Sequence, residues 1–120
     1  KDAVTATTEG ASKYAPTFTV NVKIVGGKEE EYFNGKVTLT SDTMNASEFT
    51  YEAINDKGLA QEGIATGFVT VIGDYTGGAV GDDYYFWNYT VNDVVANWGC
   101  NAYMMRDGDY LLWSFIKMAK

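Results

Sequence analysis

The strongest constraint on the fold is a period-two alternation of apolar and polar residues. Residues 17–24 read TFTVNVKI, and every second side chain is apolar. Residues 84–91 read YYFWNYTV, in which Tyr85, Trp87, Tyr89 and Val91 form one apolar row. Successive side chains of a strand point to opposite faces of its sheet, so both segments predict half-buried strands. Further strands are predicted at residues 36–40, 67–72, 102–105 and 110–117, of which the last is apolar on both faces and therefore central in its sheet.

One segment carries the signals of a helix. Asn45 is a good N-cap residue, and Glu48 follows three positions later, where its side chain can complete a capping box. Gly58 supplies a C-terminal stop. These signals predict a single short helix over residues 46–57.

Glycine, asparagine and aspartate mark the predicted turns. Asn34 and Gly35 form a two-residue sequence typical of a β-hairpin. Residues 73–83 (GDYTGGAVGDD) are predicted to form a loop, and Asn92 with Asp93 a turn. One helix among strands, without an internal repeat, predicts an α+β domain of β-grasp type, with a mostly antiparallel sheet and one packed helix.

Length and net charge limit the number of domains and the kinds of partner that this chain can have. Its 120 residues suit one domain, and residues 1–16, rich in Ala, Thr and Ser, are predicted to be a flexible lead-in to a domain over residues 17–120. The formal net charge of −7 argues against nucleic acid as a partner. No apolar run approaches the ~18 residues that a membrane span needs, so we expect contact with a membrane only through a removed or upstream anchor.

Catalytic residue types are scarce. Histidine is absent, which removes the Ser-His-Asp triad, the Cys-His pair and every zinc site that contains histidine. The single cysteine, Cys100, can form no internal disulfide, and we expect it to be a small buried residue. Two carboxylates could still do acid–base work, but no spacing selects a pair. We therefore expect that the protein is not an enzyme.

Four sequence blocks, in this order, carry a family resemblance: NASEFTYEAI, GFVTVIG, YYFWNYTVND and RDGDYLLWSF. Through them, residues 18–115 resemble the transcobalamin-like C-terminal domain, a bacterial surface module also known as domain of unknown function DUF4430. The resemblance implies a β-grasp-like fold that binds a ligand without chemistry, in an exported protein at the cell surface or outside the cell, which can contain other domains. Animal cobalamin carriers add a helical barrel, for which 120 residues leave no room, so a corrinoid is one candidate beside other small molecules. The region nearest the ligand would be residues 73–83 and the aromatic strand, with Trp87 as the matching aromatic residue.

The loop aromatics are the candidate binding residues. Tyr75 and Trp98 lie in segments rich in glycine and asparagine, where an exposed ring could stack on a flat ligand or on the face of a sugar. Tyr103 is a third candidate. Trp87 and Trp113 lie on predicted strands, where the alternative is that their rings fill the core.

The acidic loop is a candidate metal site. Asp74, Asp82 and Asp83 flank it, and calcium takes oxygen ligands of this kind. The spacing does not match an EF-hand loop, and carboxylates that keep a loop soluble are the alternative. Three functions therefore stay open: a module that binds a small molecule or a glycan, a structural spacer or adhesion module of a surface protein, and a calcium-binding domain. A spacer predicts that Tyr75 and Trp98 pack against their own domain.

Overall fold

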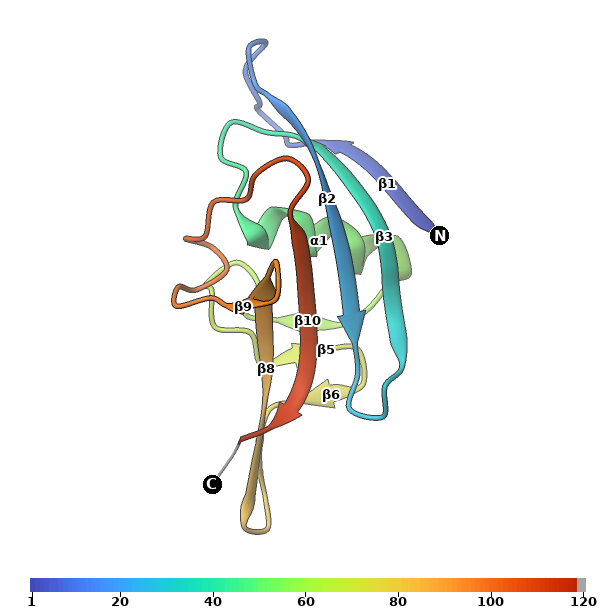
Figure 1. Ribbon diagram of the computed structural model, residues 1–120, viewed down its shortest axis with the longest axis vertical. Helices are drawn as coiled ribbons and strands as arrows, with labels where there is room; N and C mark the ends of the chain where they lie inside the picture. Colours follow the sequence, from blue (N-terminus) through green and yellow to red (C-terminus); the bar gives the residue numbers. More distant parts are fainter. Residues whose placement is uncertain (119–120) are drawn as a thin grey trace.

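The computed structural model describes residues 1–118 and contains one helix and two β-sheets within them (Figure 1). The main sheet has the strand order β1-β3-β2-β10-β8-β7, and β9 pairs with β8 at one end. The small sheet has the order β4-β5-β6. The elements are β1 (Asp2–Thr7), β2 (Thr17–Val25), β3 (Glu31–Thr40), α1 (Ala46–Lys57), β4 (Gln61–Glu62), β5 (Val71–Ile72), β6 (Tyr75–Thr76), β7 (Gly78–Val80), β8 (Asp83–Val91), β9 (Val94–Val95) and β10 (Tyr110–Lys117).

The predicted α+β class is confirmed. Two strand pairs, β1 with β3 and β10 with β2, are parallel, and the other pairs in both sheets are antiparallel. The last strand, β10, lies between β2 and β8 in the middle of the main sheet, as its apolar sequence predicts. The paired residues of β10 and β2, such as Tyr110 and Asn21, lie 89 positions apart in the sequence, so the centre of the sheet joins strands from the two halves of the chain.

The helix has the predicted bounds and both predicted caps. The Asn45 side chain accepts a hydrogen bond from the Glu48 N–H at 3.0 Å, and the Glu48 carboxylate accepts one from the Asn45 N–H at 2.9 Å. Gly58 ends the helix in the left-handed conformation, with φ of 63°. No helix within residues 1–118 has the length and apolar character that a membrane crossing requires.

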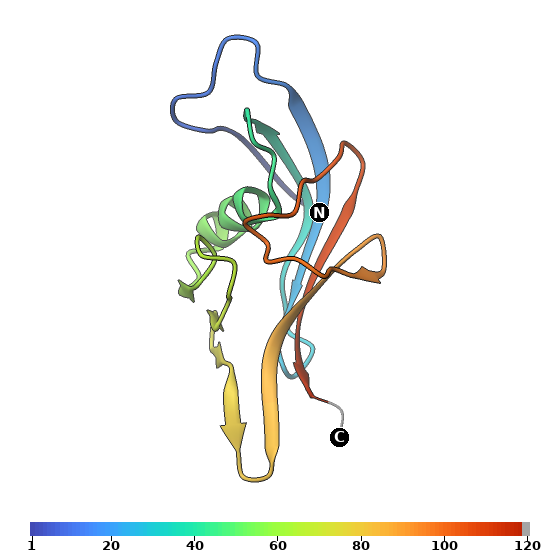
Figure 2. The same cartoon turned by 90° about the vertical axis from the view of Figure 1, so that its left-hand side faces the viewer.

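The core lies between α1 and one face of the main sheet. Figure 2 shows α1 and the small sheet on the same side of the main sheet. At the centre of this interface, the buried Trp113 of β10 donates from its indole N–H to the Thr50 hydroxyl of α1 at 2.8 Å. This hydrogen bond satisfies two polar groups that would otherwise be costly to bury. The other large, fully buried side chains are Val20, Val22, Ile24, Phe33, Val37, Leu39, Phe49, Ile54, Ile64, Ile72 and Leu111.

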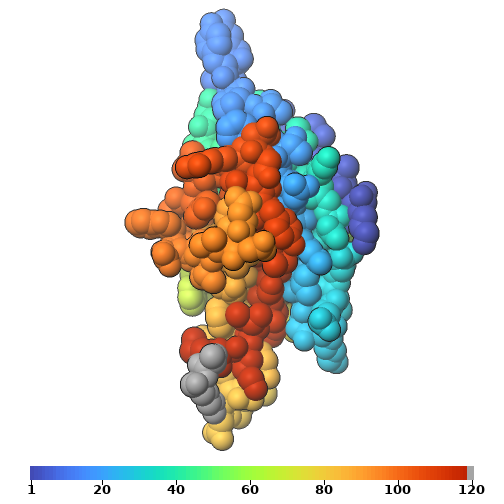
Figure 3. Space-filling model, viewed as in Figure 1, coloured from blue at the N-terminus to red at the C-terminus, as the bar shows by residue number. Residues whose placement is uncertain are grey.

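The opposite face of the main sheet is not covered by the helix, and Figure 3 is drawn from this side. Threonine hydroxyls pair across it, Thr17 with Thr40 at 2.7 Å and Thr19 with Thr38 at 2.9 Å. Three inward side chains of β2, those of Val20, Val22 and Ile24, are buried, whereas those on this face are exposed or half-buried. The alternation in residues 17–24 therefore reflects, as predicted, a strand with one face toward the core and the other toward solvent.

The start of the chain differs from its predicted state. The sequence predicts that residues 1–16 are flexible, but Asp2–Thr7 form β1, which pairs in parallel with β3 at the edge of the main sheet. Val4 and Ala6 point inward and pack against the core. Small side chains give a weak alternation signal, and the partner strand lies about 30 residues away, so only the folded chain shows the pairing.

The predicted turn at Asn34 and Gly35 is wrong. Both residues lie inside β3, and the β2–β3 hairpin turns earlier, where Glu29 has a φ of 61°. Gly35 pairs with Asp2, and a Cβ on Gly35 would overlap the Asp2 backbone oxygen. The glycine is thus required for close approach of β1, a role that the local sequence does not distinguish from a turn.

Three predicted segments change in extent. The strand expected at residues 67–72 is reduced to Val71–Ile72, because residues 63–70 form a loop. The loop expected at residues 73–83 contains β6 and β7. The strand expected at residues 102–105 is a single bridge between Met104 and Asn45.

Candidate functional site

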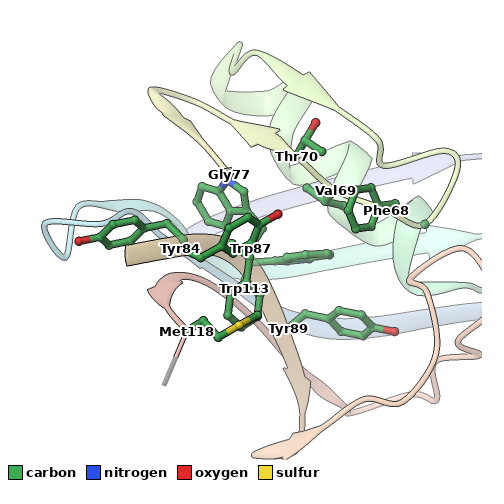
Figure 4. A pocket seen from close by; sticks show the side chains of 12 residues that line it. Phe68, Val69, Thr70, Gly77, Tyr84, Trp87, Tyr89, Trp113 and Met118 are labelled. Carbon is green, nitrogen blue, oxygen red and sulfur yellow. The ribbon is translucent and has the colours of Figure 1, made fainter. Parts of the chain in front are cut away.

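A pocket of about 350 Å³ opens between the loop at residues 67–70 and strand β8. Aromatic side chains make most of its wall, and the side chains of Figure 4 show how they surround it. We call it the aromatic pocket. Its principal lining residues are Phe68, Val69, Thr70, Tyr84, Trp87, Tyr89, Trp113 and Met118.

Two rings of the pocket are open to solvent and others are buried. Phe68 is 74% exposed and Tyr84 is 44% exposed, whereas Trp87 is only 6% exposed. The alternation of β8 turns Trp87 and Tyr89 toward the core side of the sheet. The pocket thus has an apolar floor of buried rings and accessible rings beside it.

Glycines shape the loop that presents Phe68. Gly63 and Gly67 have φ values of 94° and 85°, and the Gly67 N–H donates to the Gly63 carbonyl at 3.0 Å. A Cβ on Gly63 would overlap the carbonyl oxygen of Phe68. Glycine at this position therefore allows a tight loop from which the Phe68 ring projects.

Tyr75 lies behind the pocket and not in its wall. Its backbone carbonyl accepts a hydrogen bond from the Trp87 indole N–H at 3.0 Å, and its ring centroid lies 5.0 Å from that of Phe115. Its hydroxyl donates to the Glu30 carboxylate. This hydrogen bond is the main reason that the pKa of Tyr75 is raised to about 12, with burial second. Tyr75 therefore holds Trp87 in place from within the domain.

Trp98 and Tyr103, the other predicted loop aromatics, share a second pocket of about 340 Å³. We call it the tryptophan pocket, and its lining is Asn92, Trp98, Ala102, Tyr103, Met104, Arg106 and Asp109. Trp98 is 68% exposed. The structure thus divides the four predicted binding residues: Trp87 lines one pocket, Trp98 and Tyr103 line the other, and Tyr75 lines neither.

Tyr89 lies between the two pockets. It lines the aromatic pocket, and its hydroxyl donates to the backbone carbonyl of Trp98. Its ring meets Tyr103 edge-on, with centroids 6.2 Å apart, and lies 4.9 Å from the ring of Trp113. Burial raises the pKa of Tyr89 to about 12, so the phenol remains a hydrogen-bond donor at neutral pH.

Several lining residues were not identified from the sequence. The sequence predicts a strand at Phe68, and only the glycines on either side of its segment indicate a loop. Asn92 is predicted to form a turn, and Arg106 and Asp109 also belong to a turn in the structure, but these turns bring all three residues beside Trp98 as well. No local signal distinguishes a turn residue that lines a pocket from one that does not.

The predicted metal ligands lie in two different turns. Asp74 follows β5 and accepts a hydrogen bond from the Tyr32 hydroxyl at 3.3 Å. Asp82 and Asp83 lie where β7 turns into β8. Within residues 1–118, no group of three or more His, Cys, Asp and Glu side chains is arranged to hold a metal ion.

Cys100 is buried, as predicted. The Ser47 hydroxyl lies 3.1 Å from its sulfur, and burial raises the pKa of the thiol. A neutral, inaccessible thiol is a poor nucleophile. The residue thus packs the start of α1 against the loop that follows β9.

Comparisons with known proteins place the fold. The family model described as "Domain of unknown function (DUF4430)" matches residues 42–117. The crystal structure of haptocorrin in complex with Cbi is similar, with a TM-score of 0.69 and 18% identity over 92% of this chain, which spans 28% of that chain. The structure of "a putative metal binding protein from Ruminococcus gnavus ATCC 29149" is also similar, with a TM-score of 0.59 and 14% identity over 85% of this chain and 99% of the other. No curated protein matches the sequence.

Proposed function

The chain belongs to the family described as domain of unknown function DUF4430, and on this basis we propose that it binds a small organic molecule without transforming it. The transcobalamin-like resemblance predicted from the sequence is confirmed by this family match. The fold shared with haptocorrin agrees with it. The site that we assign to the ligand is the aromatic pocket.

The observation that carries this proposal is the exposure of Phe68 and Tyr84 next to a concave floor of buried rings. Large apolar side chains on a surface lose the free energy that burial would give them, unless a partner covers them. No carboxylate, amine or guanidinium group lines the pocket within residues 1–118. Its chemistry therefore suits the uncharged, apolar face of a flat molecule.

A corrinoid is the candidate ligand that the comparisons support. The haptocorrin structure holds Cbi, and the two proteins share the fold at 18% identity. This chain spans 28% of the haptocorrin chain.

The cellular setting is part of the proposal. We place the domain in an exported protein, at the cell surface or outside the cell, where an anchor or further domains can flank it. The family resemblance supports this placement. The absence of catalysis is supported by the lack of histidine and by the burial of Cys100.

A titration with cobinamide tests the proposed site. The emission of Trp87, which lies in the pocket wall, should change as the ligand binds. Phe68→Ala should weaken binding about tenfold or more, since an accessible ring in the contact is lost. Val94→Ala is the matched control, because Val94 is also well exposed but lies outside the pocket. Equal affinities for wild type and Phe68→Ala, or no response up to millimolar cobinamide, would favour the spacer.

Calcium binding at the β7–β8 turn, which carries Asp82 and Asp83 but not Asp74, is the second candidate, and the similar fold of the "putative metal binding protein from Ruminococcus gnavus ATCC 29149" supports it. A ligand that binds only the folded state raises the melting temperature. A calcium site therefore predicts a higher melting temperature with millimolar calcium than with a chelator, and Asp82→Asn should reduce that shift. Equal melting temperatures would contradict it.

A further inference from the structure

The tryptophan pocket shares no lining residue with the aromatic pocket and has a different character. Trp98 is 68% exposed, and Met104 beside it is 60% exposed. In the space-filling view of Figure 3, the segment that follows β8, coloured orange, projects from the edge of the molecule. The indole is thus available to a partner from solution.

The backbone around this indole is held firmly to the rest of the domain. The Tyr89 hydroxyl donates to the Trp98 carbonyl, which ties the loop to the main sheet. The Ala46 N–H donates to the Tyr103 carbonyl at 2.9 Å, and the Met105 N–H donates to the Met44 carbonyl at 2.8 Å. The pocket wall is therefore fixed to the start of α1 before a ligand arrives, and such preorganisation lowers the entropic cost of binding.

Polar groups of the pocket are positioned as well. The Asp109 carboxylate accepts hydrogen bonds from the Asn92 side-chain amide at 2.9 Å and from the Arg106 backbone N–H at 2.8 Å. Asn92 accepts in turn from the Tyr110 N–H at 2.9 Å. The Arg106 side chain, which is exposed, forms no salt bridge within residues 1–118. Its guanidinium N–H donors are available beside a fixed carboxylate acceptor.

This combination matches one class of ligand. A sugar hydroxyl both donates and accepts hydrogen bonds, so it can use the Arg106 donors and the remaining lone pairs of Asp109 together. The C–H face of a sugar ring is apolar and can stack on the Trp98 indole. An anionic ligand would approach Asp109 in a protein with a net charge of −7, and a cationic one would approach Arg106. A neutral sugar avoids both the repulsion between an anion and Asp109 and the repulsion between a cation and Arg106.

We propose that the tryptophan pocket is a second binding site, which recognises a neutral carbohydrate. Trp98 stacks on the sugar ring, and Arg106 and Asp109 bind its hydroxyls. The proposal goes beyond the function assigned to the aromatic pocket and does not depend on it.

Calorimetric titration with neutral hexasaccharides built from glucose, galactose or mannose tests this proposal, with an oligomer of galacturonic acid as the charged comparison. We expect at least one neutral oligosaccharide to bind. Trp98→Ala should lower its affinity about tenfold or more, and Arg106→Ala should also lower it. Val94→Ala is the matched control, since Val94 is exposed to the same extent, 68%, outside the pocket.

Trp98 is exposed, so Trp98→Ala should leave the melting temperature nearly unchanged, and Trp98→Phe should retain part of the affinity. Three outcomes would each overturn the proposal. The first is that no neutral oligosaccharide binds up to 10 mM (about the weakest affinity of interest). The others are equal affinity of wild type and Trp98→Ala, and preference for the acidic oligomer. Phe68→Ala separates the two sites: it should weaken cobinamide binding and leave the sugar titration unchanged. Failure at one pocket is thus distinguishable from failure at the other.

Discussion

At the scale of single residues, the Asp2 carboxylate joins three elements. One oxygen lies 2.7 Å from the Lys57 ammonium at the end of α1, and the other accepts the Asn34 N–H of β3 at 2.8 Å. The hydrogen bond from Lys57, followed by that from Asn34, holds the pKa of Asp2 below its ordinary value of 3.8. An edge strand of small residues is thus fixed at its first residue.

The lowered pKa gives a prediction for acid unfolding. The folded state binds the Asp2 proton less tightly than the unfolded chain does, so this contribution to stability is present above pH 3.8. It is lost as the pH falls through the lower folded pKa. We expect Asp2→Asn to be less stable than wild type at pH 7 and to differ less from it near pH 2.5 (about a unit below the ordinary value).

Urea unfolding at the two pH values measures this difference. Asp82→Asn is the control, because it removes an exposed carboxylate from the β7–β8 turn. A destabilisation by Asp2→Asn that is equal at both pH values would show that the ionised carboxylate is not its source.

At the scale of elements, β1 approaches β3 so closely that the side chain at position 35 decides whether the two strands can pair. Gly35 pairs with Asp2, and a Cβ there would overlap backbone atoms, which cannot move aside as a flexible side chain can. An edge strand with one neighbour has few other contacts to keep it in place.

Gly35→Ala should therefore displace the start of β1 and destabilise the fold by roughly 1–3 kcal/mol. Hydrogen exchange should become faster in Asp2–Thr7, while β10 stays protected. Lys36→Ala is the control, because Lys36 is the next residue of β3 and its side chain is exposed. Unchanged exchange of β1 in Gly35→Ala would contradict the close approach.

The two pockets also depend on particular elements. Strand β8 supplies the floor of the aromatic pocket, and the turns at its end and before β10 supply Asn92 and Asp109 to the tryptophan pocket. Tyr89 of β8 contacts both sites. We infer that β8 is the element whose position sets the geometry of both pockets.

At the scale of the whole molecule, the domain is elongated, with dimensions of 51 × 27 × 24 Å. Figure 1 shows the connection between β1 and β2 at one end of the long axis and the β7–β8 hairpin at the other. The parallel β2–β10 pair lies between these ends, with its inward side chains buried. Stability should therefore be highest in the middle and lowest at the two ends.

Hydrogen exchange of the wild-type protein measures this gradient. Backbone amides of β2 and β10 should exchange slowest, and those of Gly78–Val80 and the connection at residues 8–16 fastest, since local opening there exposes little apolar surface. Because the exchange rates of different strands are compared within one protein, the measurement needs no control variant. Exchange in β10 as fast as in β7 would contradict the central position of the β2–β10 pair.

Local signals were sufficient for part of the fold. The capping box of Asn45 and Glu48 and the stop at Gly58 involve neighbours within a few residues, so the helix could be predicted to its bounds. The continuous apolar sequence of residues 110–117 predicted a central strand, because only burial on both faces favours such a run. The exposed position of Trp98 agrees with its place in a loop of glycine and asparagine.

The sequence by itself thus determined the helix, the two long alternating strands, the central last strand and the lack of residues for most catalysis. Only the tertiary structure decided that Gly35 admits a strand from the start of the chain, that Tyr75 supports Trp87, and that Phe68 and Trp98 face separate pockets. The physical reason is the distance along the sequence between the residues that interact. Caps and alternation act between residues close in sequence, whereas a pocket and a parallel strand pair need residues that are brought together only when the whole chain has folded.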